Sequence, residues 1–112
     1  MEITVRTQGA LCIAQVDEPR IDAPAAVAFK EAMRSKTKGG PRQVVLDLTK
    51  VTFIDSSGLG AIVGAMKQLG PDRELLLAGL TPAVEKVFRL TRMDTVFRIF
   101  LTLEEALHAE RA

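Results

Sequence analysis

Two short and almost uninterrupted apolar runs constrain the fold of this chain most strongly. One is Val44-Val45-Leu46-Asp47-Leu48, and the other is Glu74-Leu75-Leu76-Leu77-Ala78. Runs of this kind are typical of strands that are buried on both faces, as in the parallel sheets of α/β proteins. A helical pattern over residues 57–69 separates them. The two strands are therefore expected to be parallel and joined by a crossover helix.

The rest of the chain extends the same alternation of strands and helices. Alternating residues over 2–7 and an apolar run over 11–16, separated by Gly9, predict an antiparallel hairpin. Residues 96–100 are expected to form a short strand or an extended link. Helix-start signals predict helices over residues 22–35, 57–69, 81–88 and from 102 onward. The signals are a candidate N-cap at Asp22, a cap followed by proline at Thr81-Pro82, and a capping box over residues 102–105.

These elements predict an α/β fold. We expect one domain over residues 1–112, because a chain of 112 residues is long enough for a single core and too short for two. The opening hairpin adds antiparallel pairing to the parallel crossovers. The sheet should therefore be mixed, with four to five strands and about four helices packed on it.

Charge and composition argue against a nucleic-acid partner. The 15 Lys and Arg residues nearly balance 14 Asp and Glu residues, which leaves a net charge of +1. Proteins that bind the phosphate backbone usually carry a clear basic excess. The chain also has no Trp, no Tyr and only 5 Phe residues, so it lacks the stacking surfaces of single-strand binders. We expect no direct contact with nucleic acid.

The sequence contains no arrangement of residues that is typical of an enzyme. His108 is the only histidine and lies in a polar helical segment, so a surface position is expected. Asp47 ends a buried strand and is interpreted as a turn or cap residue. No Cys and His spacing indicates a metal, and no glycine-rich loop indicates a nucleotide cofactor. We therefore expect no catalytic residue, no metal and no cofactor.

The N-terminal segment predicts a cytoplasmic protein. Met1–Arg6 alternates like a strand and lacks the basic and then apolar layout of a signal peptide. No window of the sequence approaches the length of a membrane span. The lone Cys12 lies in an apolar run and is interpreted as a buried thiol in a reducing compartment. No membrane partner is expected.

The helix predicted over residues 57–69 has one unusually bare face. The face expected to pack on the sheet consists of Leu59, Ile62, Val63 and Met66. The opposite face consists of Ser57, Gly60, Ala61, Gly64 and Gln68. Exposed glycines cost a helix roughly 1 kcal/mol each relative to alanine. We interpret this face as a surface that another protein approaches closely. The alternative is tight packing against a neighbouring helix of the same domain.

Two serines, Ser56 and Ser57, lie where this helix begins. A serine at a helix start usually caps it, because its hydroxyl accepts a hydrogen bond from an unpaired backbone N–H. The functional alternative is a phosphorylation acceptor. The free N–H groups and the helix dipole would stabilise a phosphate there. It would also add about two negative charges beside Asp55 and reject a partner without unfolding the domain.

The sequence resembles the bacterial anti-sigma-factor antagonists of the STAS-domain family over nearly its whole length. The resemblance rests on the Val45–Leu48 strand followed by Phe53-Ile54-Asp55-Ser56-Ser57-Gly58-Leu59-Gly60, with further similarity over residues 20–23 and 78–84. It implies partner switching. In the family the unphosphorylated protein binds an anti-sigma factor and so releases the sigma factor. That anti-sigma factor is also a serine kinase with the histidine-kinase-like ATPase fold.

The resemblance also assigns roles to individual residues. The kinase phosphorylates the first serine of the motif, here Ser56 rather than Ser57, and a PP2C-type phosphatase removes the phosphate. The residues that this implies at or near the partner surface are Asp22, Asp55, Ser57, Gly58, Gly60, Ala61 and Gly64.

One departure from the family pattern precedes this region. Many relatives carry a glycine near the position of Pro19, which stiffens the loop and is consistent with a different cognate partner. Two other functions also fit the sequence. One is a STAS scaffold or accessory subunit that does not switch, in a stress-sensing assembly or a lipid-transport ATPase. The other is a partner switch that controls a process other than transcription.

Overall fold

The computed structural model describes the backbone of residues 1–111 and the side chains of residues 1–109. Its elements are β1 (Ile3–Gln8), β2 (Leu11–Val16), β3 (Arg20–Ile21), α1 (Ala23–Thr37), β4 (Gln43–Asp47), β5 (Phe53–Ile54), α2 (Ser56–Leu69), β6 (Glu74–Ala78), α3 (Pro82–Leu90), the 3-10 turn η1 (Met93–Thr95), β7 (Ile99–Phe100) and α4 (Leu103–Arg111).

The main sheet has five strands in the order β1-β2-β4-β6-β7. The β1–β2 pair is antiparallel, and the other three pairs are parallel. The mixed α/β sheet expected from the sequence is thereby confirmed. A second, two-stranded sheet pairs β3 with β5 and was not expected, because strands of two residues show no periodicity.

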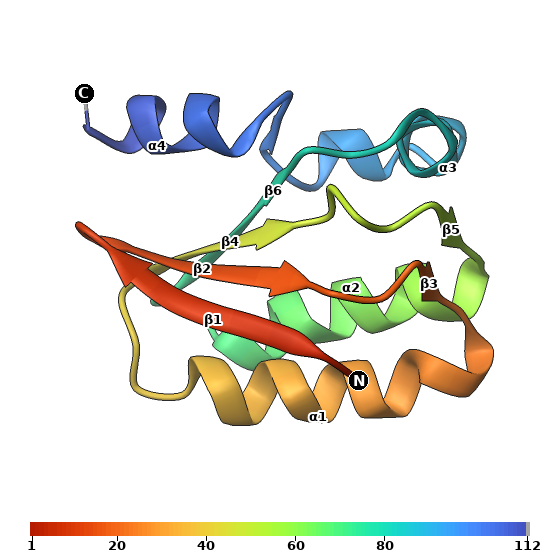
Figure 1. Ribbon diagram of the computed structural model, residues 1–112, viewed down its shortest axis with the longest axis horizontal. Coiled ribbons are helices and arrows are strands. Elements are labelled where there is room, and N and C mark those ends of the chain that lie inside the picture. Colours follow the sequence, from red (N-terminus) through yellow and green to blue (C-terminus); the bar gives the residue numbers. More distant parts are fainter. Residues whose placement is uncertain (112) are drawn as a thin grey trace.

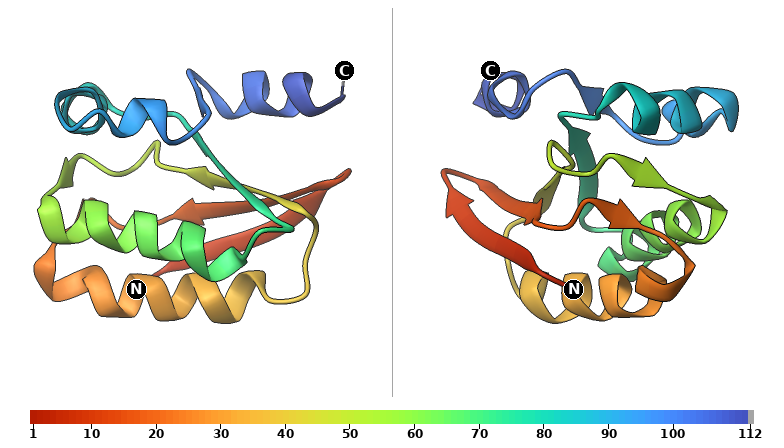
Figure 2. Two further views of the ribbon diagram at one scale, coloured as in Figure 1. Left: turned by 180° about the vertical axis from the view of Figure 1, so that it is seen from behind. Right: turned by 45° about the vertical axis from the view of Figure 1, so that its right-hand side comes forward.

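Helices cover both faces of the main sheet. In Figure 1, α1 and α2 lie on one side and α3 and α4 on the other, and the views in Figure 2 agree. Side chains of β4 alternate between the two faces. Val44 and Leu46 join the core that includes Phe29 of α1, whereas Val45 packs with Ala106 of α4. The prediction that this strand is buried on both faces is confirmed.

The helix starts follow the predicted signals with differences in their hydrogen bonds. The Thr102 hydroxyl accepts a bond of 3.1 Å from the Glu105 N–H, as in a capping box. The Glu105 carboxylate accepts from the Leu101 N–H at 3.2 Å, one residue earlier than that motif requires. Thr81 precedes α3, but its hydroxyl donates to the Val51 carbonyl at 2.7 Å. No described helix is long and apolar enough to cross a membrane.

We expect the central strands to carry most of the stability. Leu77 on β6 has no exposed surface, so Leu77→Ala should lower the free energy of unfolding by about 2–5 kcal/mol, through lost burial and the cavity left behind. Leu101→Ala is the control, because 80% of Leu101 is exposed and its loss should change stability by about 0.5 kcal/mol or less. Urea denaturation of both variants measures the difference. Equal losses would contradict this assignment of the core.

Candidate functional site

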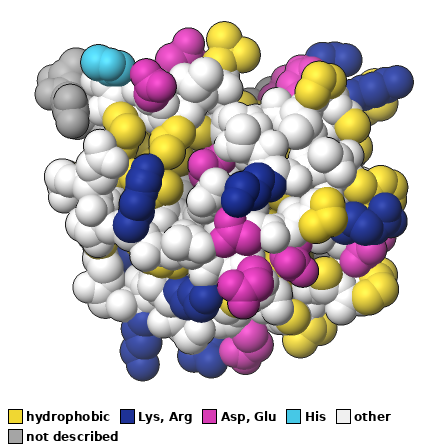
Figure 3. Space-filling model, viewed as in Figure 1, with side chains coloured by type: hydrophobic (Ala, Val, Ile, Leu, Met, Phe, Trp, Pro, Cys, Tyr) yellow, Lys and Arg dark blue, Asp and Glu magenta, His cyan; other side chains and the backbone are white. Residues whose placement is uncertain are grey.

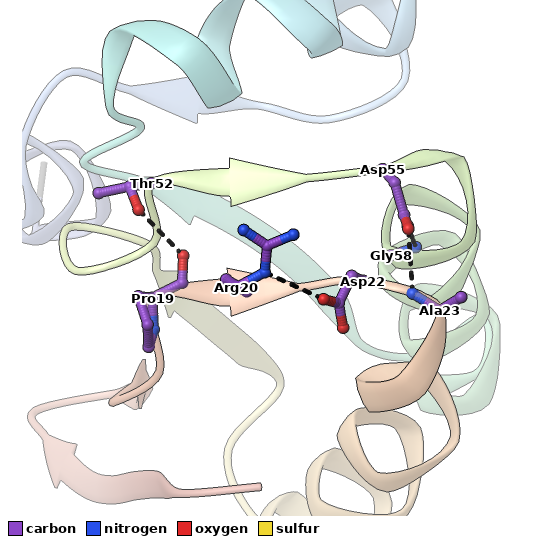
Figure 4. A network of polar contacts seen from close by, with 7 residues as sticks. All are labelled: Pro19, Arg20, Asp22, Ala23, Thr52, Asp55 and Gly58. Atoms are coloured by element: carbon purple, nitrogen blue, oxygen red, sulfur yellow. Dashed lines mark hydrogen bonds and ion pairs between the residues drawn. The ribbon is translucent and has the colours of Figure 1, made fainter.

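The small sheet brings together the starts of two helices. β3 and β5 are parallel, with Arg20 opposite Phe53 and Ile21 opposite Ile54. The chain leaves β3 directly into α1 and leaves β5 directly into α2, so both helices begin at the same end of the molecule (Figures 1 and 4). Asp22 and Asp55, which follow the two strands, are thereby placed close together.

Asp55 caps both helices with one carboxylate. Its Oδ1 atom accepts a hydrogen bond of 2.8 Å from the Gly58 N–H in the first turn of α2. Its Oδ2 atom accepts a bond of 3.0 Å from the Ala23 N–H at the start of α1. The bond from Gly58 is the largest of the effects that hold the pKa of Asp55 below its ordinary value, against an opposing effect of desolvation. Asp55 is therefore a charged clamp between the two helix starts.

Asp22 occupies the N-cap position of α1 as expected, but its side chain makes no capping hydrogen bond. Instead, its Oδ2 atom accepts a hydrogen bond of 3.1 Å from Arg20 Nε (Figure 4). Asp22 is thus the N-cap residue by position, as predicted, but the side-chain hydrogen bond at this helix start is made by Asp55. The reason is the small β3–β5 sheet, which brings the Asp55 carboxylate to the Ala23 N–H from a distant part of the chain.

Ser56 and Ser57 are the first two residues of α2, and both are exposed. Asp55, not a serine, occupies the N-cap position. Neither hydroxyl makes a hydrogen bond to any residue that the structure describes. The capping alternative for these serines is thereby wrong, and the Ser56 hydroxyl has no structural role in this part of the chain.

Gly58 is buried, although the resemblance places it at the partner surface. A Cβ atom at this position would lie 1.9 Å from the Ile21 carbonyl oxygen and 2.7 Å from the Ile21 carbonyl carbon. Glycine is required here because the backbones of α2 and β3 approach each other too closely for any side chain. Its role in the structure is the packing of the two motif segments, which corrects the expectation of a surface position.

The bare face of α2 is smaller than the helical pattern predicts. Ala61 is only 3% exposed, and Gly64 is half-buried beside Lys30 of α1, whose side chain would lie 3.4 Å from a Cβ at Gly64. Gly64 lies against α1, and Ala61 belongs to the buried core, so the alternative of packing within the domain is correct for Ala61. Of the face expected for a partner, the exposed residues are Ser57, Gly60 and Gln68.

Two residues that the sequence interpretation did not single out complete the site. The guanidinium carbon of Arg20 lies 4.0 Å from the centre of the Phe53 ring, and Phe53 is 39% exposed. Their contact follows from the register of the small sheet, so only a prediction of that sheet would have revealed it.

Residues outside this region behave as structural or surface groups. The Asp47 carboxylate accepts hydrogen bonds from the Thr49 N–H, at 3.0 Å, and from its hydroxyl, which confirms a turn residue. His108 is exposed, as expected. Among the residues described, no group of three or more His, Cys, Asp and Glu side chains is placed to hold a metal ion.

The fold and this region define a small α/β domain with an exposed serine beside a carboxylate that caps two helices. The model of the STAS domain matches residues 2–106, which is nearly the whole chain. The chain belongs to the STAS-domain family.

Comparison with individual proteins agrees with this assignment. The chain is 36% identical over 80 residues to the "Anti-sigma-B factor antagonist" of Listeria monocytogenes, an alignment that covers 70% of each protein. It is also similar to the crystal structure of an anti-sigma factor antagonist from Mycobacterium paratuberculosis, with a TM-score of 0.87 and 27% identity over 99% of this chain and 94% of that one. The unphosphorylated antagonist SpoIIAA shares the fold, with a TM-score of 0.77 and 20% identity over 98% and 96% of the two chains.

The clamp predicts a pH dependence that is specific to Asp55. The pKa of Asp55 is lower in the folded state than in the unfolded state, where it is near 3.8, so the charged carboxylate stabilises the fold above this pH. This stabilisation is lost as the pH falls through the pKa of Asp55 in the folded protein. The stability difference between the wild type and Asp55→Asn should be largest at neutral pH and shrink in this acid range. Urea denaturation at a series of pH values measures it, and a difference that does not change with pH would contradict the clamp.

Gly58 and Gly60, both near the start of α2, allow a matched comparison of alanine substitutions at a buried and an exposed glycine. Gly58→Ala should lower the free energy of unfolding by about 1–3 kcal/mol or more, because the Ile21 backbone must move. Gly60→Ala should raise it by up to about 1 kcal/mol, because nothing lies within 4 Å of the added Cβ and alanine is the better helix former. Thermal or urea denaturation distinguishes them. A stable Gly58→Ala variant would contradict the close approach of β3 and α2.

Proposed function

We propose that this chain is an anti-sigma-factor antagonist whose binding is switched off by phosphorylation of Ser56. The observation that carries the proposal is the exposed Ser56 hydroxyl, which has no hydrogen-bond partner in the described chain because Asp55 already caps α2. A kinase can modify such a hydroxyl without breaking a bond that the fold needs. The names of the relatives supply the class of partner.

The electrostatics of this position suit a switch. A phosphate on Ser56 would lie in the first turn of a helix of 14 residues, where the helix dipole favours negative charge. It would add about two charges next to the Asp55 carboxylate. A partner that approaches the start of α2 then meets a concentrated negative charge and a bulky group. Binding is lost while the core beneath the helix keeps its contacts.

The proposed contact surface follows from which residues are accessible. It comprises Ser57 and Gly60, the half-buried Gly64, and the carboxylates of Asp22 and Asp55. Gly58 and Ala61 are not part of it, since both are buried. The partner is an anti-sigma factor that is also a serine kinase with the histidine-kinase-like ATPase fold, and a PP2C-type phosphatase reverses the modification. The regulated process is the release of a sigma factor.

Two baits test this function directly. Ser56→Ala should retain the kinase-like ATPase from a lysate of the source cells, whereas Ser56→Asp should lose it, because the added charge stands in for part of the phosphate. Mass spectrometry identifies the retained protein. Incubation of the wild type with that protein and ATP should then yield a phosphopeptide modified at Ser56.

Phosphorylation of Ser56→Ala and of Ser57→Ala is the matched control, because Ser57 is also exposed and lies one residue further along the helix. Ser57→Ala should still be phosphorylated, and Ser56→Ala should not. Phosphate on Ser57 and not on Ser56 would overturn the assignment of the acceptor. Retention of the same proteins by both Ser56 baits would overturn the switch and indicate a constitutive scaffold or subunit.

A further inference from the structure

An exposed cation, Arg20, lies beside the proposed contact surface. Its side chain is 56% exposed, whereas that of Asp22, with which it pairs, is only 19% exposed. A partner that approaches from this side therefore meets the guanidinium before it meets the carboxylate. In Figure 3 acidic and basic side chains intermix across the face, and hydrophobic side chains gather along its right-hand edge, where Figure 1 places β3, β5 and the starts of α1 and α2.

The backbone that carries Arg20 is firmly held. The Pro19 carbonyl accepts hydrogen bonds from the Thr52 N–H at 2.8 Å, from the Phe53 N–H at 3.2 Å and from the Thr52 hydroxyl at 3.2 Å. Arg20 itself is paired with Phe53 in the small sheet. Proline at position 19 adds its own restriction of the backbone. The base of the Arg20 side chain is therefore fixed relative to α2.

The far end of the side chain is held as well. The guanidinium lies over the Phe53 ring, 4.0 Å from its centre, and its Nε atom donates to Asp22 Oδ2 at 3.1 Å. Its two terminal nitrogens, Nη1 and Nη2, have no hydrogen-bond partner among the described residues. Much of the entropy that a free arginine loses on binding has thus already been lost here. The two terminal N–H groups of Arg20 are therefore already positioned as donors beside the exposed ring of Phe53.

We propose that Arg20, held by Phe53 and Asp22, is a specificity-determining anchor that binds an Asp or Glu carboxylate on the partner. A carboxylate matches the geometry of the guanidinium fork and can accept from both terminal nitrogens. Arginine and aromatic residues are also the types that most often dominate binding energy at interfaces. This inference rests on the proposed function and names the chemistry of its partner.

The direction of the effect on affinity tests the inference. In the Ser56→Ala background, Arg20→Ala should weaken binding to the purified ATPase by about tenfold or more, as expected when an arginine that anchors an interface is lost. The affinity of Arg20→Lys should lie between that of Arg20→Ala and that of the protein with Arg20 intact, because lysine keeps the charge but lacks the paired N–H donors of the guanidinium. Arg20→Glu should weaken binding most. Calorimetric titration measures the dissociation constants, and circular dichroism verifies that each variant is folded.

Arg34→Ala is the matched control, because the Arg34 side chain is also 56% exposed and ion-paired, with Glu31 at 2.9 Å, but lies towards the other end of α1. It should leave affinity unchanged. Unchanged affinity of Arg20→Ala would overturn the inference. Tighter binding would also overturn it, since it would mean that the partner brings a cation to Asp22. Either result leaves the proposed function intact, whereas failure of the Ser56→Ala bait to retain any such ATPase overturns the proposed function itself.

Discussion

The carboxylate of Asp55 is the interaction on which the geometry of this region depends. One oxygen caps α2 through Gly58 and the other caps α1 through Ala23, so two helix starts that are far apart in the sequence share one charge. The arrangement is possible because β3 pairs with β5 and because Gly58 has no side chain to hold the two segments apart. The motif around Asp55 thus connects the starts of α1 and α2. The exposed serines that follow it are not needed for this connection and can contact a partner or be modified.

The sequence predicted the elements that have a clear period. β2 and β6 lie where their apolar patterns place them, and β4 lies within one residue of its predicted limits, because strands in a core alternate or are buried on both faces over five or six residues. The small sheet could not be predicted in this way. β3 and β5 have two residues each, which is too short for any periodicity. Their pairing depends on contacts between segments more than 30 residues apart.

The errors at the site have the same physical origin. Local signals correctly marked Asp22 as the residue before a helix, but they carry no information on a carboxylate that arrives from elsewhere in the fold, and Asp55 takes the capping bond. A helical wheel likewise separates apolar from small residues without indicating what lies opposite the small ones. On α2, Ala61 is buried in the core and Gly64 lies against Lys30 of α1, whereas Gly60 is exposed. The motif could be recognised from the sequence, but the structure was needed to show which of its residues cap a helix, which are buried and which are exposed.

The separation of these roles among different residues explains how the proposed switch can act on binding alone. The residue that joins the helices, Asp55, and the residue that would be modified, Ser56, are adjacent but have separate tasks. If Ser56 capped α2, a phosphate would break a bond that the fold uses, and regulation would cost stability. Because Asp55 makes those bonds and the Ser56 hydroxyl makes none within the described chain, the added charge acts on what approaches from outside. Arg20 pairs with the neighbouring Asp22, so the proposed specificity for a partner and the proposed control by phosphate would act on one surface through groups of opposite charge.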